Sequence, residues 1–372
     1  MPPAEDVSRR LLIAVGPTAG HVYPALAIID AYRARCPGLE VRLVGAVHAV
    51  AAPLLVAGGY DLERVSASPL VNVGLGGKLA AAGRVAAGFL QARRLLRARP
   101  PRLAIGLGGY ASGAVLLAAR TLGARVVIHE SNALPGLANR LLAPLAQRIY
   151  LGRLAEASTF GRRDALVTGH PLRADIAALA GNARPAPPRD RPARVLVLSS
   201  TRGERFFAER VPELLAAVER QGIAVEALHQ SGQLDPAGVA EAYRRADVKA
   251  TVAPYVDAMA RAYRWADVVV ARSGAGTLAE IAAAGLPSLL IPLPDASGDH
   301  QAANAAVVAA DGAAIVVSEA AWPRDPLAKR LTTLLGDSGT WTEMASAARR
   351  LARPEAAVSI VEDCEALMAG RW

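Results

Sequence analysis

The chain has 372 residues, too many for one ordinary hydrophobic core and about right for two domains. Apolar residues make up 52% of the chain and aromatic residues only 4%, which favours helices packed on parallel sheets over an aromatic-rich β-sandwich. The two cysteines, Cys36 and Cys364, are far apart, which argues against a disulfide framework or a zinc site and fits a reducing cytoplasm.

Charge is unevenly distributed along the chain. Residues 1–170 carry 20 Lys/Arg and 9 Asp/Glu, a net charge of +11, whereas the remainder carries 22 and 24, a net charge of −2. A basic half can attract an anionic membrane surface or nucleic acid, and it can equally reflect an Arg-rich genome. RNA-binding signatures, zinc-finger spacings and basic-zipper heptads are missing from the sequence, so we expect no nucleic-acid partner. No apolar run reaches the roughly 20 residues of a spanning helix, so we expect a cytoplasmic protein that does not cross a membrane.

Short apolar runs alternate with helical stretches, which is the rhythm of βαβ units. In the first half we predict strands at 11–16, 41–46, 103–108, 125–130 and 148–152. A segment rich in Pro and Arg interrupts the rhythm at 183–194, after which strands are predicted at 194–200, 224–230, 249–254, 267–273, 287–293 and 313–317. The sequence therefore predicts an α/β protein with two Rossmann-like, doubly wound parallel-sheet domains facing a central cleft. We place the domains at 1–170 and 194–354, with a linker at 171–193 and a C-terminal helix at 355–372 that can pack on the first domain.

The first strand is followed by the turn GPTAGHVYPALAI, residues 16–28. Its small residues allow a phosphate or sugar to approach the backbone, and the helix predicted to begin near His21 offers unpaired N–H groups. A histidine at a helix N-terminus is biased toward its neutral form, which can accept a proton. Simple capping of the helix by His21 is the alternative.

Two further clusters follow strands of the first half. GLGGYASG (106–113) combines glycines with the hydroxyls of Tyr110 and Ser112, and tight strand-to-helix packing is the alternative explanation for its glycines. HESN (129–132) places four polar residues at a strand end that looks buried, where they require ligand or network partners.

The second half has a third cluster, VARSGAGTLAEIAAAGLP (270–287). Small residues at a strand end, Thr277 at a helix start and Glu280 one turn later match the way such folds bind a pyrophosphate and a ribose. The following loop, IPLPDASGDHQAANA (291–305), supplies Asp299, His300 and Gln301, and as a solvated loop it would be unremarkable.

Taken together and in order, these segments resemble the MurG family. The matching motifs are GxTxGHVYPALA, GLGGYASG, HESNALPGLANR, TGHPLRADI, HQSG, YVDAMARAYRWADVVVARSGAGTLAEIAAAGLP and DHQAANA, and they span nearly the whole chain. The resemblance implies a GT-B glycosyltransferase that moves N-acetylglucosamine from UDP-N-acetylglucosamine to lipid-linked muramyl-pentapeptide, the lipid I to lipid II step of peptidoglycan synthesis. It implies a peripheral enzyme on the inner face of the cell membrane that inverts the anomeric centre and needs neither metal nor cofactor, the UDP-sugar being a co-substrate.

The resemblance also implies roles for individual residues. His21 is the candidate base, Thr18, Ala19 and Gly20 line the sugar and acceptor phosphate, and Asn132 holds the donor sugar. Arg173 reaches the nucleotide, Val256 borders the uracil, Glu280 binds the ribose and Gln301 binds sugar hydroxyls. The remaining expected substrate contacts are Thr201, Ser273, Ala275, Gly276, Thr277, Leu278 and His300.

Three segments depart from the family pattern. GPTAG replaces a GGTGG-like first turn, SSTRG (199–203) replaces a GGSQG-like turn, and GHP replaces GNP. A proline pushes the preceding residue toward extended geometry, and serine does not reach glycine-only conformations cheaply. The departures leave open a related transferase that acts on a different, soluble small-molecule acceptor. A UDP-sugar 2-epimerase or a non-catalytic UDP-sugar binder on the same scaffold is the third hypothesis.

Residues 74–102 are the candidate membrane contact. Leu79, Val85, Phe89, Leu90 and Leu96 are interspersed with Lys78, Arg84, Arg93, Arg94, Arg97 and Arg99, as expected for a helix lying on anionic headgroups. An ordinary surface helix with a buried apolar stripe is the alternative.

Overall fold

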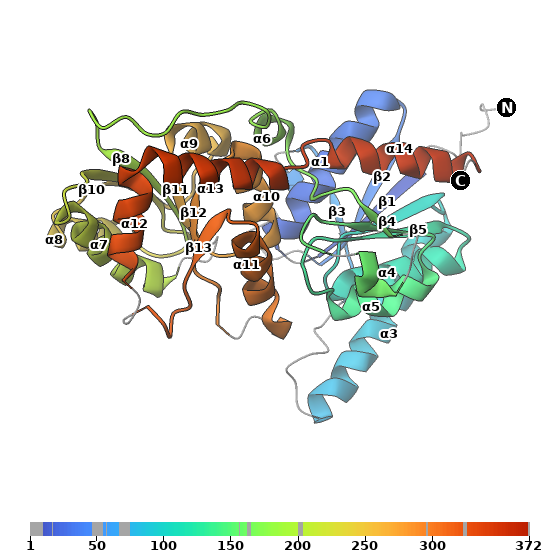
Figure 1. The fold of residues 1–372 in the computed structure, drawn as a ribbon. Helices are drawn as coiled ribbons and strands as arrows, with labels where there is room; N and C mark the ends of the chain where they lie inside the picture. Colours follow the sequence, from blue (N-terminus) through green and yellow to red (C-terminus); the bar gives the residue numbers. More distant parts are fainter. Residues whose placement is uncertain are drawn as a thin grey trace. The chain divides into compact units, whose positions relative to one another are not determined.

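The protein is represented by a computed structural model that describes residues 10–16, 18–46, 55–56, 58–66, 75–155, 157–161, 165–199, 204–294, 297–322 and 326–370. The chain forms two compact units, Met1–Arg173 with Arg353–Trp372 (unit 1) and Ala174–Ala352 (unit 2). Each unit is described by itself below (Figure 1).

Unit 1 is built around a parallel sheet with the strand order β3-β2-β1-β4-β5-β6-β7 in the described residues. The strands are β1 (Arg10–Val15), β2 (Glu40–Gly45), β3 (Leu62–Arg64), β4 (Leu103–Gly106), β5 (Arg125–Glu130), β6 (Arg148–Leu151) and β7 (Ala165–Val167). The helices are α1 (Ala19–Arg35), α3 (Leu75–Arg97), α4 (Tyr110–Thr121), α5 (Leu137–Leu142) and α14 (Ala356–Met368), with 3₁₀ turns η2 (Ala143–Leu145) and η3 (Ala157–Phe160). The edge strands β3 and β7 are absent from the sequence prediction because three residues give too little periodicity to detect.

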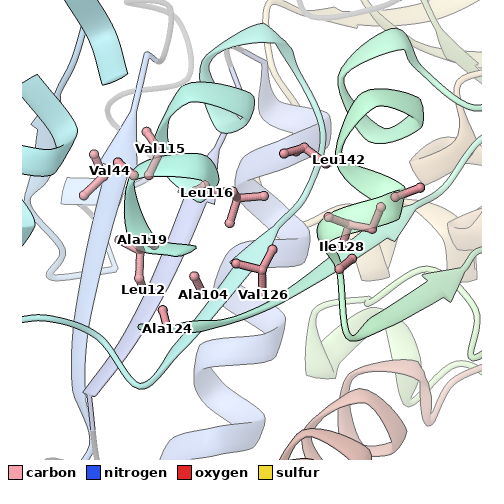
Figure 2. Packing of buried hydrophobic residues seen from close by; sticks show 14 of the residues in the cluster. Leu12, Val44, Ala104, Val115, Leu116, Ala119, Ala124, Val126, Ile128 and Leu142 are labelled. Atoms are coloured by element: carbon pink, nitrogen blue, oxygen red, sulfur yellow. The ribbon is translucent and has the colours of Figure 1, made fainter. Parts of the chain in front are cut away.

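Alternation along β1 explains why both faces of this sheet are covered. Leu11 and Ile13 point to one face, where they join the core formed with α1 and α14. Leu12 and Ala14 point to the other face. There α4 places Val115, Leu116 and Ala119 against Leu12, Ala104, Val126 and Ile128 (Figure 2). Strands buried on both faces need the near-continuous apolar runs that the sequence shows.

The C-terminal helix α14 is fixed to unit 1 by polar contacts as well as by its apolar face. Tyr150 donates a hydrogen bond of 2.8 Å to Asp363, which also pairs with Arg148 at 3.1 Å. Arg35 of α1 pairs with Glu362 at 3.3 Å and Glu365 at 2.9 Å. The last helix of the chain is thereby part of the first structural unit.

Unit 2 repeats the plan with the parallel order β10-β9-β8-β11-β12-β13 in the described residues. Its strands are β8 (Ala193–Leu198), β9 (Val225–Gln230), β10 (Lys249–Ala253), β11 (Val268–Ala271), β12 (Ser288–Leu290) and β13 (Ala314–Val316). Its helices are α6 (Ala174–Ala177), α7 (Arg205–Glu219), α8 (Pro236–Arg245), α9 (Met259–Trp265), α10 (Ala275–Ala284), α11 (His300–Ala310), α12 (Leu327–Gly336) and α13 (Ser338–Leu351), with the 3₁₀ turn η4 (Ser297–Asp299). The predicted α/β class with two doubly wound parallel sheets is confirmed.

The segment that the sequence assigns to a linker is attached to unit 2. Arg184 donates to the carbonyls of Tyr263 and Arg264, both at 2.7 Å, and Arg191 forms a two-pronged pair with the buried Asp267 at 2.6 and 2.9 Å. The segment rich in Pro and Arg is therefore a stretch of irregular backbone that packs on unit 2.

Candidate functional site

His21 lies in the first turn of α1, at the carboxyl end of β1, and two glycines border its ring. The helix begins at Ala19, earlier than predicted, and keeps Pro24 within it. A Cβ on Gly16 would lie 2.8 Å from His21 Cγ, and one on Gly108, whose φ is +88°, would lie 3.5 Å from His21 Nε2. Glycines in two separate turns thus leave the room that this imidazole occupies.

The surroundings of His21 favour its neutral form. Burial lowers the pKa of His21 to about 4, and the negative charge of Glu130 opposes that shift. His21 Nδ1 lies 2.9 Å from the hydroxyl of Thr18. When Nδ1 carries the ring proton and donates a hydrogen bond to the Thr18 hydroxyl oxygen, Nε2 has a lone pair that can receive the proton of an incoming alcohol.

Glu130, at the end of β5, is a buried carboxylate held by neutral donors. Its Oε1 accepts from the main-chain amide and the side-chain Nδ2 of Asn132, both at 3.0 Å. Its Oε2 accepts from the Gly136 amide and from Asn139 Nδ2, both at 2.9 Å. These contacts, all those recorded for the Glu130 carboxylate in the described part of the chain, include no cation, so its charge is available to stabilise positive charge on His21. The sequence had singled out Glu130 as polar but had not assigned it to the site.

The other residues of unit 1 that the sequence nominated take several positions. Ala19 and Gly20 form the first turn of α1, and Asn132 is oriented by Glu130 as described. Arg173 stacks over the ring of Tyr23 at 5.0 Å from its centroid, a contact that the sequence had not indicated. Ser112 is fully buried and its hydroxyl donates to the Gly109 carbonyl at 2.8 Å, which stabilises the first turn of α4.

Among the described residues, the N-terminus of α10 in unit 2 presents amides without a hydrogen-bond partner. Gly274 is the N-cap and no described side chain caps the helix, while Leu278 makes the first intrahelical bond, to the Gly274 carbonyl at 3.0 Å. The amides of Ala275, Gly276 and Thr277 therefore point out of the helix end. Three N–H groups and the helix dipole suit the oxygens of a diphosphate. Leu278 itself is 5% exposed and belongs to the interior.

Two hydrogen bonds hold the residues that are expected to contact the ribose and the base. The buried Tyr263 donates a hydrogen bond of 2.9 Å to Oε2 of Glu280, which fixes that carboxylate one turn into α10. At the end of β9, Oε1 of Gln230 accepts from the amide of Val256 at 3.0 Å. The loop at 254–256 is thus held by a side chain from the neighbouring strand.

Gln301, near the start of α11, has its amide orientation fixed by the main chain. Its Oε1 accepts from the amides of Ser273 at 3.2 Å and Leu293 at 3.1 Å. The oxygen is occupied, so the NH₂ group is the part of Gln301 that can donate to sugar hydroxyls. Asn304, fully buried, donates to the Ser273 carbonyl at 3.0 Å and ties the same turn to α11. His300 is the first residue of α11, directly after Asp299, which has a φ of +53°.

Arg272 is a residue of this region that the sequence analysis missed. It is 6% exposed, donates from Nε to Glu204 at 2.6 Å, also pairs with Glu319, and its Nη1 donates to the Ile291 carbonyl at 3.0 Å. One guanidinium thereby joins the segments that follow β8, β12 and β13. Its partners lie 47 and 68 residues away, so no local pattern could have revealed it.

Thr201 lies outside the described residues, as does Pro17. In the described part of the chain no group of three or more His, Cys, Asp or Glu residues is arranged to hold a metal ion. None of the described helices combines the length and apolar character needed to span a membrane.

Comparison with known proteins defines the class. The N-terminal domain model of glycosyltransferase family 28 matches residues 11–151, and the C-terminal domain model of that family matches residues 194–360. Together with the two doubly wound sheets, these matches define a glycosyltransferase with two Rossmann-like domains, the GT-B class.

Whole-length relatives narrow the class to one family. The chain is 40% identical to the UDP-N-acetylglucosamine–N-acetylmuramyl-(pentapeptide) pyrophosphoryl-undecaprenol N-acetylglucosamine transferase of Nitrosococcus oceani, covering 97% of this chain and 99% of that one. It is 37% identical to the protein of the same name from Shewanella oneidensis, over 97% and 98% of the two chains. The crystal structure of Acinetobacter baumannii MurG superposes with a TM-score of 0.76 at 28% identity, over 96% and 99% of the chains. The chain belongs to the MurG family, as its motifs predicted.

A more distant neighbour bears on the third hypothesis. A putative UDP-N-acetylglucosamine 2-epimerase from Listeria monocytogenes has a TM-score of 0.68 but only 16% identity, over 97% of each chain. That likeness shows a common fold and carries no argument for epimerase activity.

Proposed function

We propose that this protein transfers N-acetylglucosamine from UDP-N-acetylglucosamine to a lipid-linked N-acetylmuramyl-pentapeptide, a step of peptidoglycan synthesis. The observation that carries the proposal is the identity of 36–40% to transferases named for this reaction, over about 97% of the chain. Both turns that suggested a soluble acceptor fall partly outside the described residues.

The reaction we propose is a single displacement. The acceptor hydroxyl oxygen forms a bond to the anomeric carbon while the bond from that carbon to the UDP oxygen breaks, which inverts the configuration. The hydroxyl proton passes to Nε2 of His21, and the negative charge of Glu130 stabilises the imidazolium that forms. The departing UDP takes the bonding electrons as negative charge on its diphosphate.

The donor side of the proposal rests on unit 2. The unpaired amides of Ala275, Gly276 and Thr277 would receive the diphosphate, Glu280 the ribose hydroxyls, Val256 the uracil edge and the NH₂ of Gln301 the sugar. Neutral amides and a helix dipole supply the charge stabilisation that a metal ion provides in other transferases. We therefore expect transfer to persist in EDTA.

A transfer assay tests the function directly. Purified full-length protein is incubated with labelled UDP-N-acetylglucosamine and an undecaprenyl- or shorter polyprenyl-pyrophosphoryl muramyl-pentapeptide, and the lipid product is analysed by mass spectrometry. We expect one added N-acetylhexosamine and stoichiometric UDP. Release of UDP without a lipid product, or transfer only to water-soluble acceptors, contradicts the proposal, and conversion of donor without any acceptor indicates an epimerase.

We also propose that unit 1 places the protein on the cytoplasmic face of an anionic membrane. Two of the apolar residues predicted to contact the membrane face the core of unit 1 instead. Leu96 is buried there together with Ala92, and Phe89 packs against this core. The outer face of α3 retains Leu90, 64% exposed, beside the exposed Arg93, Arg94 and Arg97. Leu137 and Leu141 of α5, the latter 63% exposed, add apolar surface one helical turn apart.

Vesicle co-sedimentation tests the membrane proposal. We expect the protein to bind vesicles containing phosphatidylglycerol and to release them as salt rises, with weaker binding for Arg93→Glu/Arg94→Glu. A matched charge reversal on unit 2, Arg244→Glu/Arg245→Glu, serves as the control. Equal loss of binding in both variants would show that net charge alone is responsible.

A further inference from the structure

Three consecutive hydrogen bonds in unit 1 lead from a main-chain carbonyl to His170. His129 Nε2 lies 2.8 Å from the carbonyl oxygen of Gly169, and His129 Nδ1 lies 3.3 Å from the hydroxyl of Ser131. That hydroxyl lies 2.8 Å from Nδ1 of His170. The two rings are 6.0 Å apart, edge to face, and both are nearly buried, with His129 2% and His170 7% exposed.

The direction of each hydrogen bond follows from the carbonyl at its start. A carbonyl oxygen only accepts, so His129 carries a proton on Nε2. Burial lowers the pKa of His129, which keeps the ring neutral and leaves Nδ1 as an acceptor for the Ser131 hydroxyl. Because the single O–H of Ser131 donates its hydrogen bond to His129 Nδ1, the Ser131 oxygen accepts a hydrogen bond from Nδ1–H of His170.

The last ring then has a defined tautomer. Burial, together with the positive charges that His129 and His21 would carry, lowers the pKa of His170 to about 3, so this ring is also neutral. With its proton on Nδ1, His170 presents a lone pair at Nε2. Among the described residues no hydrogen bond reaches that nitrogen.

Two glycines hold the backbone of this series of hydrogen bonds, Gly169 where it begins and Gly152 beside Ser131 in its middle. A Cβ on Gly152 would lie 2.6 Å from the carbonyl oxygen of Ser131, and a Cβ on Gly169 would lie 2.4 Å from Cβ of Arg353. The amides of Gly152 and Gly169 donate to the carbonyls of Glu130 at 2.7 Å and Leu151 at 3.0 Å. Ser131 is therefore held by backbone on one side while Asn132, the next residue, is held by Glu130.

We propose that Asn132 and His170 bind the same donor sugar, that His170 accepts a hydrogen bond through Nε2 from a neutral donor group of that sugar, and that the carbonyl of Gly169 sets this role through His129 and Ser131. The inference rests on the proposed function for the identity of the sugar. A lone pair selects a hydroxyl or an amide N–H and does not favour a phosphate oxygen, so His170 would discriminate among hexoses rather than bind the diphosphate.

The tautomers can be measured without any substrate. Two-bond ¹H–¹⁵N correlation spectra of histidine-labelled full-length protein, assigned with single His→Gln variants, report which nitrogen of each ring is protonated. We expect Nε2–H for His129 and Nδ1–H for His170, and in Ser131→Ala we expect His170 to change to Nε2–H. Ser359→Ala on α14 is the control and should change neither ring. Nε2–H on His170 in the unaltered protein overturns the inference.

Two substitutions separate the two edges of the ring. The short amide in His170→Asn can keep the contact with Ser131 but lacks an outer acceptor, whereas the longer amide in His170→Gln can return an acceptor to the Nε2 position. We expect donor affinity to fall about tenfold in His170→Asn and to be largely restored in His170→Gln. Thermal unfolding of both variants shows whether folding is intact.

The partner group is identified with donor analogues. UDP-N-acetylglucosamine is compared by calorimetry with analogues that lack one hydroxyl or the acetamido N–H. The analogue without the partner group should bind about tenfold more weakly to the unaltered protein and show no further loss in His170→Asn. Equal losses in both proteins for every analogue contradict the inference. Because binding needs no acceptor, this outcome is independent of whether transfer to a lipid-linked acceptor is observed.

Discussion

The strand ends of the two units share one topology but carry different chemistry. Unit 1 brings together ionisable side chains, namely the buried histidines His21, His129 and His170 and the carboxylate Glu130. In the described residues no cation pairs with that carboxylate. Unit 2 gathers main-chain amides at the start of α10, and most of its side chains are used to hold that backbone, as Gln301 and Asn304 do.

In the function proposed above, the difference matches what each half of a transfer reaction requires. Removing a proton needs a basic group whose charge state the protein controls, and burial of an imidazole provides it. Holding a diphosphate needs several donors in a fixed array, which a helix end supplies without a titrating group. Duplicated architecture can therefore be divided between proton chemistry and anion binding by changing a few strand-end residues.

The largest expected effect tests the chemical role of unit 1. We expect His21→Ala to lower kcat by about 10³-fold while donor affinity changes little, because in the proposed mechanism His21 acts on the transition state and the diphosphate contacts lie in unit 2. Steady-state kinetics and calorimetry with UDP provide the two numbers. A parallel loss of affinity and turnover would place His21 among the donor contacts instead.

The next effect tests the internal framework of unit 2. Arg272→Met removes a buried cation and leaves Glu204 and Glu319 without it, so we expect a loss of about 3–5 kcal/mol of unfolding free energy. Urea denaturation measures it. Arg210→Met, which removes an exposed ion pair with Glu213, is the matched control and should cost less than about 1 kcal/mol. Similar losses of unfolding free energy for both substitutions would show that Arg272 does not stabilise the strand ends of unit 2.

Acid should destabilise unit 1 before unit 2. The pKa values of His21 and His170 lie at about 4 and about 3, and that of His129 is also lowered, whereas unit 2 contributes His229 at about 4. A histidine with a depressed folded pKa binds protons more readily when unfolded, so its stabilising effect is complete above about pH 6.5 and is lost as pH falls toward 4. Each such group changes stability by at most about 1.4 kcal/mol per pH unit.

Hydrogen exchange resolved by peptide, corrected for intrinsic rates, measures this difference between pH 7 and pH 5. We expect protection to fall first around β1, β5 and α1. A uniform loss across both sheets would mean that the histidines of unit 1 are no more costly to protonate than those elsewhere.

The smallest effect tests the binding role of unit 2. Glu280→Ala should weaken UDP-N-acetylglucosamine binding by about tenfold, roughly 1.4 kcal/mol, with kcat nearly unchanged at saturating donor. Glu241→Ala, on the exposed surface of α8, is the control. If turnover falls more than affinity, Glu280 has a part in the chemistry and the division of labour between the units is less sharp.

Local patterns in the sequence were enough to predict the sheets and several candidate positions. Apolar runs predicted most strands within one or two residues, because a strand buried on both faces must be apolar throughout. Small-residue turns marked the ends of β1, β4 and β11 because only small residues allow backbone to approach a ligand closely. The sequence did not predict the short edge strands β3 and β7 or the start of α1 at Ala19. These features depend on strand pairing and packing rather than on periodicity.

By itself the sequence determined two doubly wound domains, the family and the motifs that contain His21, Glu280 and Gln301, because each of these is encoded within a short window. Only the tertiary structure decided that Arg272 joins Glu204 to Glu319, and that hydrogen bonds connect the Gly169 carbonyl through His129 and Ser131 to His170. Such groups meet because parallel strands end at one edge of a sheet, so hydrogen bonds and charges there connect residues that are tens of positions apart in the chain.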